Sequence, residues 1–366
     1  MSEERLLLSE VPRVSFYDPN SGRAPEDVPF PSCLAAAARY LGSDFPWIPQ
    51  PKGAPVNFAY ILPLAASGMA FGLRWKAGWH PDNVDHMFIA DPEEIIRRAF
   101  AAVGYRYTTL SRAGNPDGPG TPADEARFRR EIIASLQRGV PVLAFGVIGP
   151  PECCLITGCD QGGDVLIGWN FFAQMVPFNT GVTYEPNGMF RKAHWFPETH
   201  SLLLIGERAE PAFDLVDTLR WAVAVARQPN LWGHPTGHAA YSAWADQLTD
   251  EFSGLPEQIQ RERHSIHDSQ VGQLAECRFY GAEFLRYQAG LAGGSTASVL
   301  RQAADCFQAE HDLMWKVWEV AGGHSHPEAW AHFAEPAVRQ AIIALILEAQ
   351  HQNRTGTDLL ARLVEP

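Results

Sequence analysis

The chain has 366 residues, of which 46% are hydrophobic and 19% charged, so its composition is that of a globular protein and not of a disordered one. Its length exceeds the usual size of a single hydrophobic core, and we therefore expect two domains. Acidic residues outnumber basic residues by 42 to 29, and the formal charge of −13 argues against nucleic acid or an anionic membrane as a partner.

The cysteines and the amino terminus indicate the compartment. The six cysteines show no CxxC spacing, which predicts free thiols in a reducing environment. The opening residues, MSEERLLLSEVPR, lack the basic start and long apolar core of a signal peptide. No apolar run approaches the ~18 residues of a membrane span. These features predict a cytoplasmic protein.

Residues 1–28 are expected to be an extended lead-in, with a short edge strand at Val14–Tyr17. The next stretch, PFPSCLAAAARYLG, predicts a helix with Ser32 as its N-cap and Gly42 just past its end. Cys33 would then lie in the first helical turn, where unpaired N–H groups and the macrodipole stabilise a thiolate. The alternative is that Cys33 is a small buried apolar residue, which is the usual fate of a free cysteine.

The segment after this helix is rich in turn-forming residues. Residues 45–68 are expected to be mostly loop, and Ala70–Trp75 a strand. The polar loop that follows, GWHPDNVDHMF, carries His80 and His86 among several acids and an asparagine. These side chains form a candidate ligand or metal site. The alternative is a turn in which the side chains cap their own backbone.

Two capped helices and a set of strands complete the first domain. Asp91 and Thr121 are expected N-caps, each followed by a proline at the first helical position. Short apolar runs predict strands at 105–110, 141–148, 152–158, 164–170 and 200–205. A glycine-containing turn at residues 159–163 joins two of these strands as a hairpin. Helices first and an antiparallel sheet second is an α+β pattern.

This order resembles the papain-like cysteine peptidase fold, including the bacteriocin-leader peptidases, in the cysteine at a helix start and in the block PPECCLITGCDQGGDVLIGWN. The whole chain is similar to the family of the amino-terminal domain of butirosin biosynthesis protein H, which joins this domain to a helical region. That family includes an enzyme that transfers an acyl group from a carrier protein to an amine. The resemblance therefore implies a thiol nucleophile and a thioester intermediate.

The family's roles map onto four positions of this sequence. Cys33 occupies the nucleophile position and Asn170 that of the orienting Asp or Asn. The histidine position holds Glu152, and the oxyanion-hole glutamine position holds Asp27. Glutamate is a poor substitute for histidine as the base that takes the thiol proton. The pKa of a thiol exceeds that of glutamate by about 4.2 units, but that of histidine by only about 2. A carboxylate nearby would also raise the pKa of the thiol.

Three hypotheses follow from this departure. In the first, His80, His86 or His194 serves as base and the protein is a cysteine-dependent acyltransferase or amidohydrolase. In the second, catalysis is lost and an acidic cleft with Asp27 and Glu152 binds a small cationic or peptide ligand. In the third, Cys33, Glu152 and Cys154 bind a metal, because alternate residues of a strand share a face. The candidate ligand-binding residues are His80, His86, Cys154 and Trp169.

The sequence after Pro211 predicts a bundle of about six helices. Long helical patterns are expected at 213–227, at 238–248, at 277–291, from Ser295 to Val320, and from Pro336 to Gln352. The complete expectation is a papain-like α+β domain, residues 1–208, followed by an all-helical domain, residues 211–366. Cys33 would act on a small molecule, a peptide or a carrier-protein thioester. No cofactor is implied, and a homodimer is left open.

Overall fold

The computed structural model describes residues 5–113, 120–173, 175–252, 254–324 and 326–365. The chain forms two compact units, one from residues 1–63 with 100–212 and the other from residues 64–99 with 213–366. A single boundary near residue 210 therefore does not describe this grouping, because residues 64–99 group with the helical unit. The run AGNPDGPGTP at residues 113–122, whose glycines and prolines predict a surface loop, lies largely outside the described residues.

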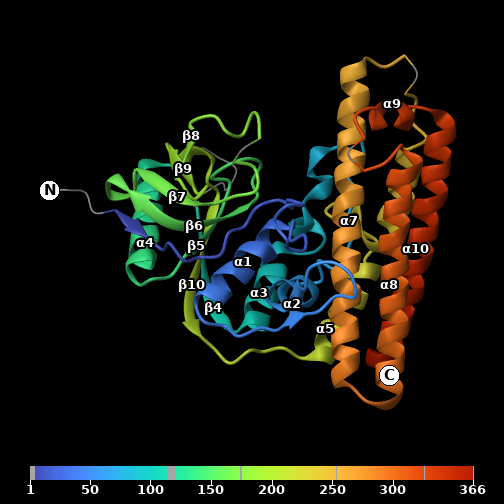
Figure 1. The fold of residues 1–366 in the computed structure, drawn as a ribbon, viewed down its shortest axis with the longest axis horizontal. Helices are drawn as coiled ribbons and strands as arrows, with labels where there is room; N and C mark the ends of the chain where they lie inside the picture. Colours follow the sequence, from blue (N-terminus) through green and yellow to red (C-terminus); the bar gives the residue numbers. More distant parts are fainter. Residues whose placement is uncertain (1–4, 114–119, 174, 253, 325, 366) are drawn as a thin grey trace. The chain divides into compact units, whose positions relative to one another are not determined.

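The first unit is a mixed α and β structure built on a large antiparallel sheet (Figure 1). Its strands are β1 (Leu6–Leu7), β4 (Tyr105–Ser111), β5 (Val142–Phe145), β6 (Cys153–Asp160), β7 (Val165–Trp169), β8 (Val182–Tyr184), β9 (Phe190–Ala193) and β10 (Ser201–Arg208). Within the described residues the sheet has eight strands in the order β4-β10-β5-β6-β7-β9-β8, and β1 also pairs with β6. The predicted antiparallel sheet is thus confirmed, while β8 and β9 were not predicted.

Two helices cover the two faces of this sheet. Helix α4 (Pro122–Gln137) packs its apolar side chains, including Phe128 and Ile132, on a face of the sheet that includes Cys154. Helix α1 (Pro29–Tyr40) contacts β5 and β6, and its Cys33 approaches the backbone of Cys153. Because successive strand residues point to opposite faces, the two helices lie on opposite sides of the sheet (Figure 1).

The start of α1 differs from the prediction. The helix begins at Pro29, with Val28 as its N-cap, so Ser32 is not the cap and Cys33 lies in the second turn. The reason is that the first N–H groups of a helix need no partner within it, so Pro29 and Pro31 fit in its first turn. The predicted end is confirmed, since Gly42 has φ +84° and donates to Arg39 O at 3.0 Å.

Three other segments also differ from their predictions. Val14–Tyr17 forms no strand. The expected loop at 45–68 contains the strands β2 (Trp47–Ile48) and β3 (Val56–Asn57) and the helix α2 (Phe58–Ala66). An unbroken apolar run, FAYILPLAA, forms α2 despite Pro63, because burial of these side chains outweighs the helix propensity of proline. Ala70–Trp75 forms only an isolated bridge, from Arg74 to Thr236.

The second unit is predominantly helical (Figure 1). Its elements are most of α3 (Pro92–Val103), α5 (Leu215–Arg227), the hairpin β11 (Asn230–Leu231) and β12 (His234–Pro235), α6 (Gly237–Gln247), α7 (Glu257–Leu291), α8 (Gly294–Val320), α9 (Ala329–Phe333) and α10 (Pro336–Val364). The predicted helices are confirmed, and α7 and α10 are longer than expected. Within the described residues, no helix has the length and apolarity needed to cross a bilayer.

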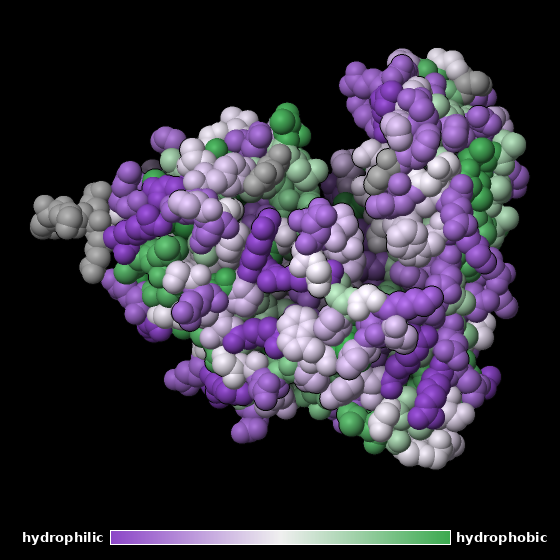
Figure 2. Space-filling model, in the orientation of Figure 1, coloured by the Kyte–Doolittle hydropathy of each residue, from purple (hydrophilic) through white to green (hydrophobic). Residues whose placement is uncertain are grey.

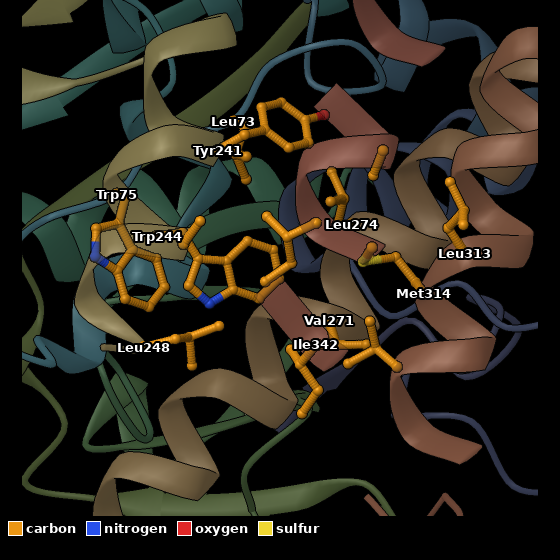
Figure 3. Packing of buried hydrophobic residues seen from close by; sticks show 14 of the residues in the cluster. Leu73, Trp75, Tyr241, Trp244, Leu248, Val271, Leu274, Leu313, Met314 and Ile342 are labelled. Atoms are coloured by element: carbon orange, nitrogen blue, oxygen red, sulfur yellow. The ribbon is translucent and has the colours of Figure 1, made fainter. Parts of the chain in front are cut away.

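Aromatic residues from residues 64–99 complete the core of this unit. Trp75 stacks on Trp244 of α6 with ring centroids 5.5 Å apart, and both rings are fully buried. Figure 3 shows them beside apolar side chains of the neighbouring helices. Arg278 of α7, also fully buried, donates to Ala70 O at 2.6 Å and to Gly72 O at 3.0 Å. The segment therefore belongs to this core through both packing and hydrogen bonds.

Candidate functional site

A pocket of about 550 Å³ lies in the first unit. Its walls come from the extended segment 12–26, from α1, and from Trp47 and Asn57. Helix α1 contributes Ser32, Ala36 and Arg39, whose i, i+4, i+7 spacing places them on one helical face. Pockets of this volume are typical of small-molecule sites.

Three polar side chains in this pocket form a chain of hydrogen bonds. Arg39 donates to Asn57 Oδ1 from Nε at 2.9 Å and from Nη2 at 2.6 Å. Glu26 is hydrogen-bonded to the Asn57 side chain as well. Because Oδ1 accepts from Arg39, the amide N–H₂ group is the end that donates to Glu26. Asn57 therefore lies between an acid and a base.

Burial in the pocket shifts the pKa values of Glu26 and Arg39. Burial raises the pKa of Glu26 from 4.5 to about 7, against the opposing effects of its bond to Asn57 and of the nearby Arg23 and Arg39. Burial lowers the pKa of Arg39, although Glu26 and Asp44 oppose this. A strongly perturbed carboxyl group in a cleft is a mark of a functional site.

The segment that forms one wall of the pocket is fixed by residues predicted to be functional. Asp27 accepts a hydrogen bond from Tyr17 N at 2.7 Å, and burial raises its pKa to about 6. Trp169 is buried and donates from Nε1 to Val11 O at 3.3 Å. Asp27 and Trp169 therefore position the pocket wall, and Glu26, one residue before Asp27, faces the pocket.

Cys33 has the surroundings of a core residue. Its side chain is fully buried, and Sγ lies 3.8 Å from Cys153 O. Ser32 and Ala36 line the pocket, but Cys33 is not one of its lining residues. A thiol placed in this way is available to a substrate only if the surrounding packing opens.

Of the two neighbouring cysteines of β6, Cys153 and not the expected Cys154 lies beside Cys33. Cys154 packs with α4 on the far face of the sheet, whereas Cys153 faces Cys33. Burial raises the pKa of Cys153 well above its usual range, and the hydrogen bond with Cys33 adds to this. Burial likewise raises the pKa of Cys154. Cys33 therefore approaches Cys153, and not Cys154 as the metal hypothesis expected.

Glu152 and Asn170 lie at the ends of neighbouring strands. Glu152 directly precedes β6, is half-buried, and is close enough to contribute to the raised pKa of Cys153. Asn170 follows β7 and is buried; its Nδ2 donates to Ile148 O at 3.4 Å and its Oδ1 accepts from Phe172 N at 2.6 Å. Both ends of this amide hold loop backbone, as in an Asx turn.

The candidate histidines have other partners. His80 accepts a hydrogen bond from Asp82 N, so the turn alternative for this loop is confirmed. His86 is buried in the second unit with Nδ1 3.5 Å from Cys277 Sγ, and burial lowers its pKa to about 3. His194 is exposed, with φ +49°. His86 is therefore neutral near pH 7 and is paired with a different thiol from Cys33.

The metal hypothesis gains no support from the geometry. Across the residues that the structure describes, no three His, Cys, Asp or Glu side chains gather in a way that could hold a metal ion. Cys154 also lies on the other face of the strand from the one that Cys33 approaches.

The pocket residues Glu26, Arg39 and Asn57 are not among the residues that the sequence predicts to be functional. A weak signal existed, because Arg39 is the one charged residue in an otherwise apolar helix, and such an arginine needs a partner. That partner, Asn57, is 18 residues away in a segment expected to be loop. No protein-family model matches the chain, and no curated protein matches it either.

Proposed function

We propose that the first unit has a papain-like fold that binds a small amine-bearing or peptide ligand in the Glu26 pocket, without a covalent step at Cys33. One observation carries this proposal. The pocket lies on the face of α1 that bears Ser32 and Arg39 and contains the acid Glu26, while Cys33 is fully buried on another face. This is the second hypothesis from the sequence, in which an acidic cleft binds a small cationic or peptide ligand. The acid in the cleft is Glu26 instead of Asp27 and Glu152.

The Glu26 end of the pocket suits a cation, while Arg13, Arg23 and Arg39 also line the pocket. An ammonium group beside Glu26 would form a charge-assisted hydrogen bond in a partly buried site, where such bonds are strongest. The ligand would also relieve the unfavourable burial of the carboxylate, which is expressed in its raised pKa.

Thermal unfolding of the full chain tests this function with a panel of simple amines, amino acids and short peptides. A ligand that binds only the folded state raises the melting temperature, by an amount set by its concentration relative to Kd. We expect the ligand-induced rise to persist in Cys33→Ala and to be lost in Glu26→Gln. Glu125→Gln, which changes an acid on α4, is the matched control. A rise that survives Glu26→Gln, or that needs Cys33, would contradict the proposal.

A second candidate function is the cysteine-dependent acyltransferase or amidohydrolase. The observation that favours it is the contact of α1 with β6, which brings Cys33 to the strand that follows Glu152, as the resemblance implies. A carrier-protein thioester would then be an acyl donor. Iodoacetamide at neutral pH separates the two candidates. A catalytic Cys33 would be alkylated faster than the half-buried Cys306, and a core Cys33 more slowly.

A further inference from the structure

We infer that the Glu26 pocket recognises a free α-amino acid, whose ammonium group pairs with Glu26 and whose carboxylate pairs with Arg39. This inference rests on the proposed binding function and deepens it by naming the class of ligand. It follows from the way in which one side chain, Asn57, holds the two charged groups.

Asn57 fixes the acid and the base at a short separation. Its side chain is buried, its Oδ1 accepts two hydrogen bonds from Arg39, and Ala59 N donates to the same oxygen at 3.1 Å. Glu26 bonds to the other end of the amide. The carboxyl and guanidinium groups therefore flank the three atoms of one O–C–N unit, and neither can move far while the amide holds it.

An α-amino acid has the matching dimensions. It carries its ammonium and carboxylate on a single carbon, so its two charges are separated by a few bonds, as are the two ends of the Asn57 amide. A dipeptide places its termini one residue further apart, which adds ~3.8 Å between consecutive Cα atoms. The short separation of Glu26 and Arg39 thus favours the free amino acid over a peptide.

Arg39 retains capacity for a carboxylate. Its described hydrogen bonds use Nε, to Asn57, and Nη2, to Asn57 and to Phe45 O at 3.1 Å. Within the described part of the chain, Nη1 makes no hydrogen bond. The guanidinium is also held over the ring of Trp47, 4.5 Å from its centroid. It is therefore an oriented donor, which costs little ordering when a carboxylate arrives.

The rest of the pocket has room for the ligand's side chain. The volume of about 550 Å³ extends beyond the Glu26–Asn57–Arg39 group along the wall formed by residues 12–18, which includes the apolar Val14 and Phe16. This wall is where selection between amino acids would occur.

The test uses the full chain and the standard set of α-amino acids, with thermal unfolding as the screen and calorimetry on the best ligand. For that amino acid, the methyl ester lacks the carboxylate and the N-acetyl form lacks the ammonium. We expect each to bind about tenfold or more weakly than the parent, the range of a lost charge-assisted hydrogen bond. Equal binding of the parent and either derivative would overturn the inference.

Variants assign each contact to its residue. In Glu26→Gln the N-acetyl form and the parent should bind alike, while the ester remains weaker. In Arg39→Gln the reverse holds, so that the ester and the parent bind alike. Glu125→Gln and Arg130→Gln, on α4, are matched controls and should keep both preferences. Far-ultraviolet circular dichroism verifies that each variant is folded.

The outcomes also separate this inference from the function on which it rests. If simple amines bind and depend on Glu26 while no α-amino acid binds better than they do, the binding function holds and the amino-acid assignment is wrong. If no amine, amino acid or peptide of the panel stabilises the protein, both are wrong. A preference for dipeptides over free amino acids would overturn the amino-acid assignment and leave the binding function intact.

Discussion

Glu26→Gln should stabilise the protein, and more at high pH than at low pH. Burial raises the pKa of Glu26 from 4.5 to about 7, so the folded state binds more protons than the unfolded state between these values. The folded state is therefore progressively destabilised as the pH rises from about 4.5 to about 7 and Glu26 ionises. Glutamine cannot ionise, so the variant does not carry this cost.

The size of the effect follows from the two pKa values. A pKa raised from 4.5 to about 7 corresponds to about 3.4 kcal/mol of destabilisation once the group is ionised in both states. Nearly all of this cost applies at about pH 8, and less than about 1 kcal/mol at about pH 5. Water reaches part of this half-buried side chain, so we expect the variant to gain about 2 kcal/mol more at the higher pH.

Urea unfolding at the two pH values measures this difference. The gain of Glu26→Gln over wild type is compared between them, so that every group common to both proteins cancels, as does the altered bond to Asn57. Glu125→Gln, which changes an acid on α4, is the control and is measured in the same way. A gain in unfolding free energy that is the same at both pH values, or a variant that is less stable than wild type at the higher pH, would contradict this prediction. Either result would show that burying the ionised Glu26 does not destabilise the fold. A stabilising change that abolishes binding is the usual signature of a functional site.

Three further changes test the fold by urea unfolding. Glu310→Gln should cost about 3–5 kcal/mol, because it leaves the fully buried Arg278 without its carboxylate, 2.8 Å away; the exposed Glu257→Gln is the control and should cost at most about 0.5 kcal/mol. Thr121→Ala should cost about 1 kcal/mol, because the capping box of α4 is lost. Gly42→Ala should cost about 1 kcal/mol from its φ of +84°, since an added Cβ meets no atom within 4 Å.

The elements that sequence predicted well are those with local signals. Thr121 with Pro122, and Asp91 with Pro92, mark the starts of α4 and α3 to the residue. These signals depend on hydrogen bonds within a few residues, such as Asp91 to Glu93 N at 3.1 Å, so no tertiary information is needed. The hairpin at residues 159–163 was predictable for the same reason.

The elements that sequence missed depend on distant partners. Ala70–Trp75 has the apolar content of a strand, but the carbonyl groups of Ala70 and Gly72 accept hydrogen bonds from Arg278, more than 200 residues away. Most side chains of α2 are buried, and the free energy of this burial outweighs the poor helix propensity of Pro63. The start of α1 differs from the predicted Ser32 cap because prolines disfavour the interior of a helix but are compatible with its first turn, as at Pro29 and Pro31.

The candidate site was missed for a related reason. The resemblance directs attention to Cys33, in the second turn of α1, and to Glu152 and Asn170, at the ends of neighbouring strands. Of the adjacent acids Glu26 and Asp27, Glu26 lines the pocket, whereas the resemblance marks Asp27. Which of two adjacent acids faces a cavity depends on the path of the backbone, here set by the hydrogen bond from Tyr17 N to Asp27.

In helix α1, the residues that line the pocket and Cys33 point to different sides. Successive residues of a helix are rotated by about 100°, so Ser32 and Cys33 point to different sides. Ser32, Ala36 and Arg39 line the pocket, and Cys33 packs on β6. A ligand beside Arg39 is therefore outside the reach of the sulfur unless the helix turns about its axis, which the two prolines and the packing of Cys33 oppose. Binding in this pocket and chemistry at Cys33 are consequently separable, and a change at residue 33 should leave the affinity of the pocket unaltered.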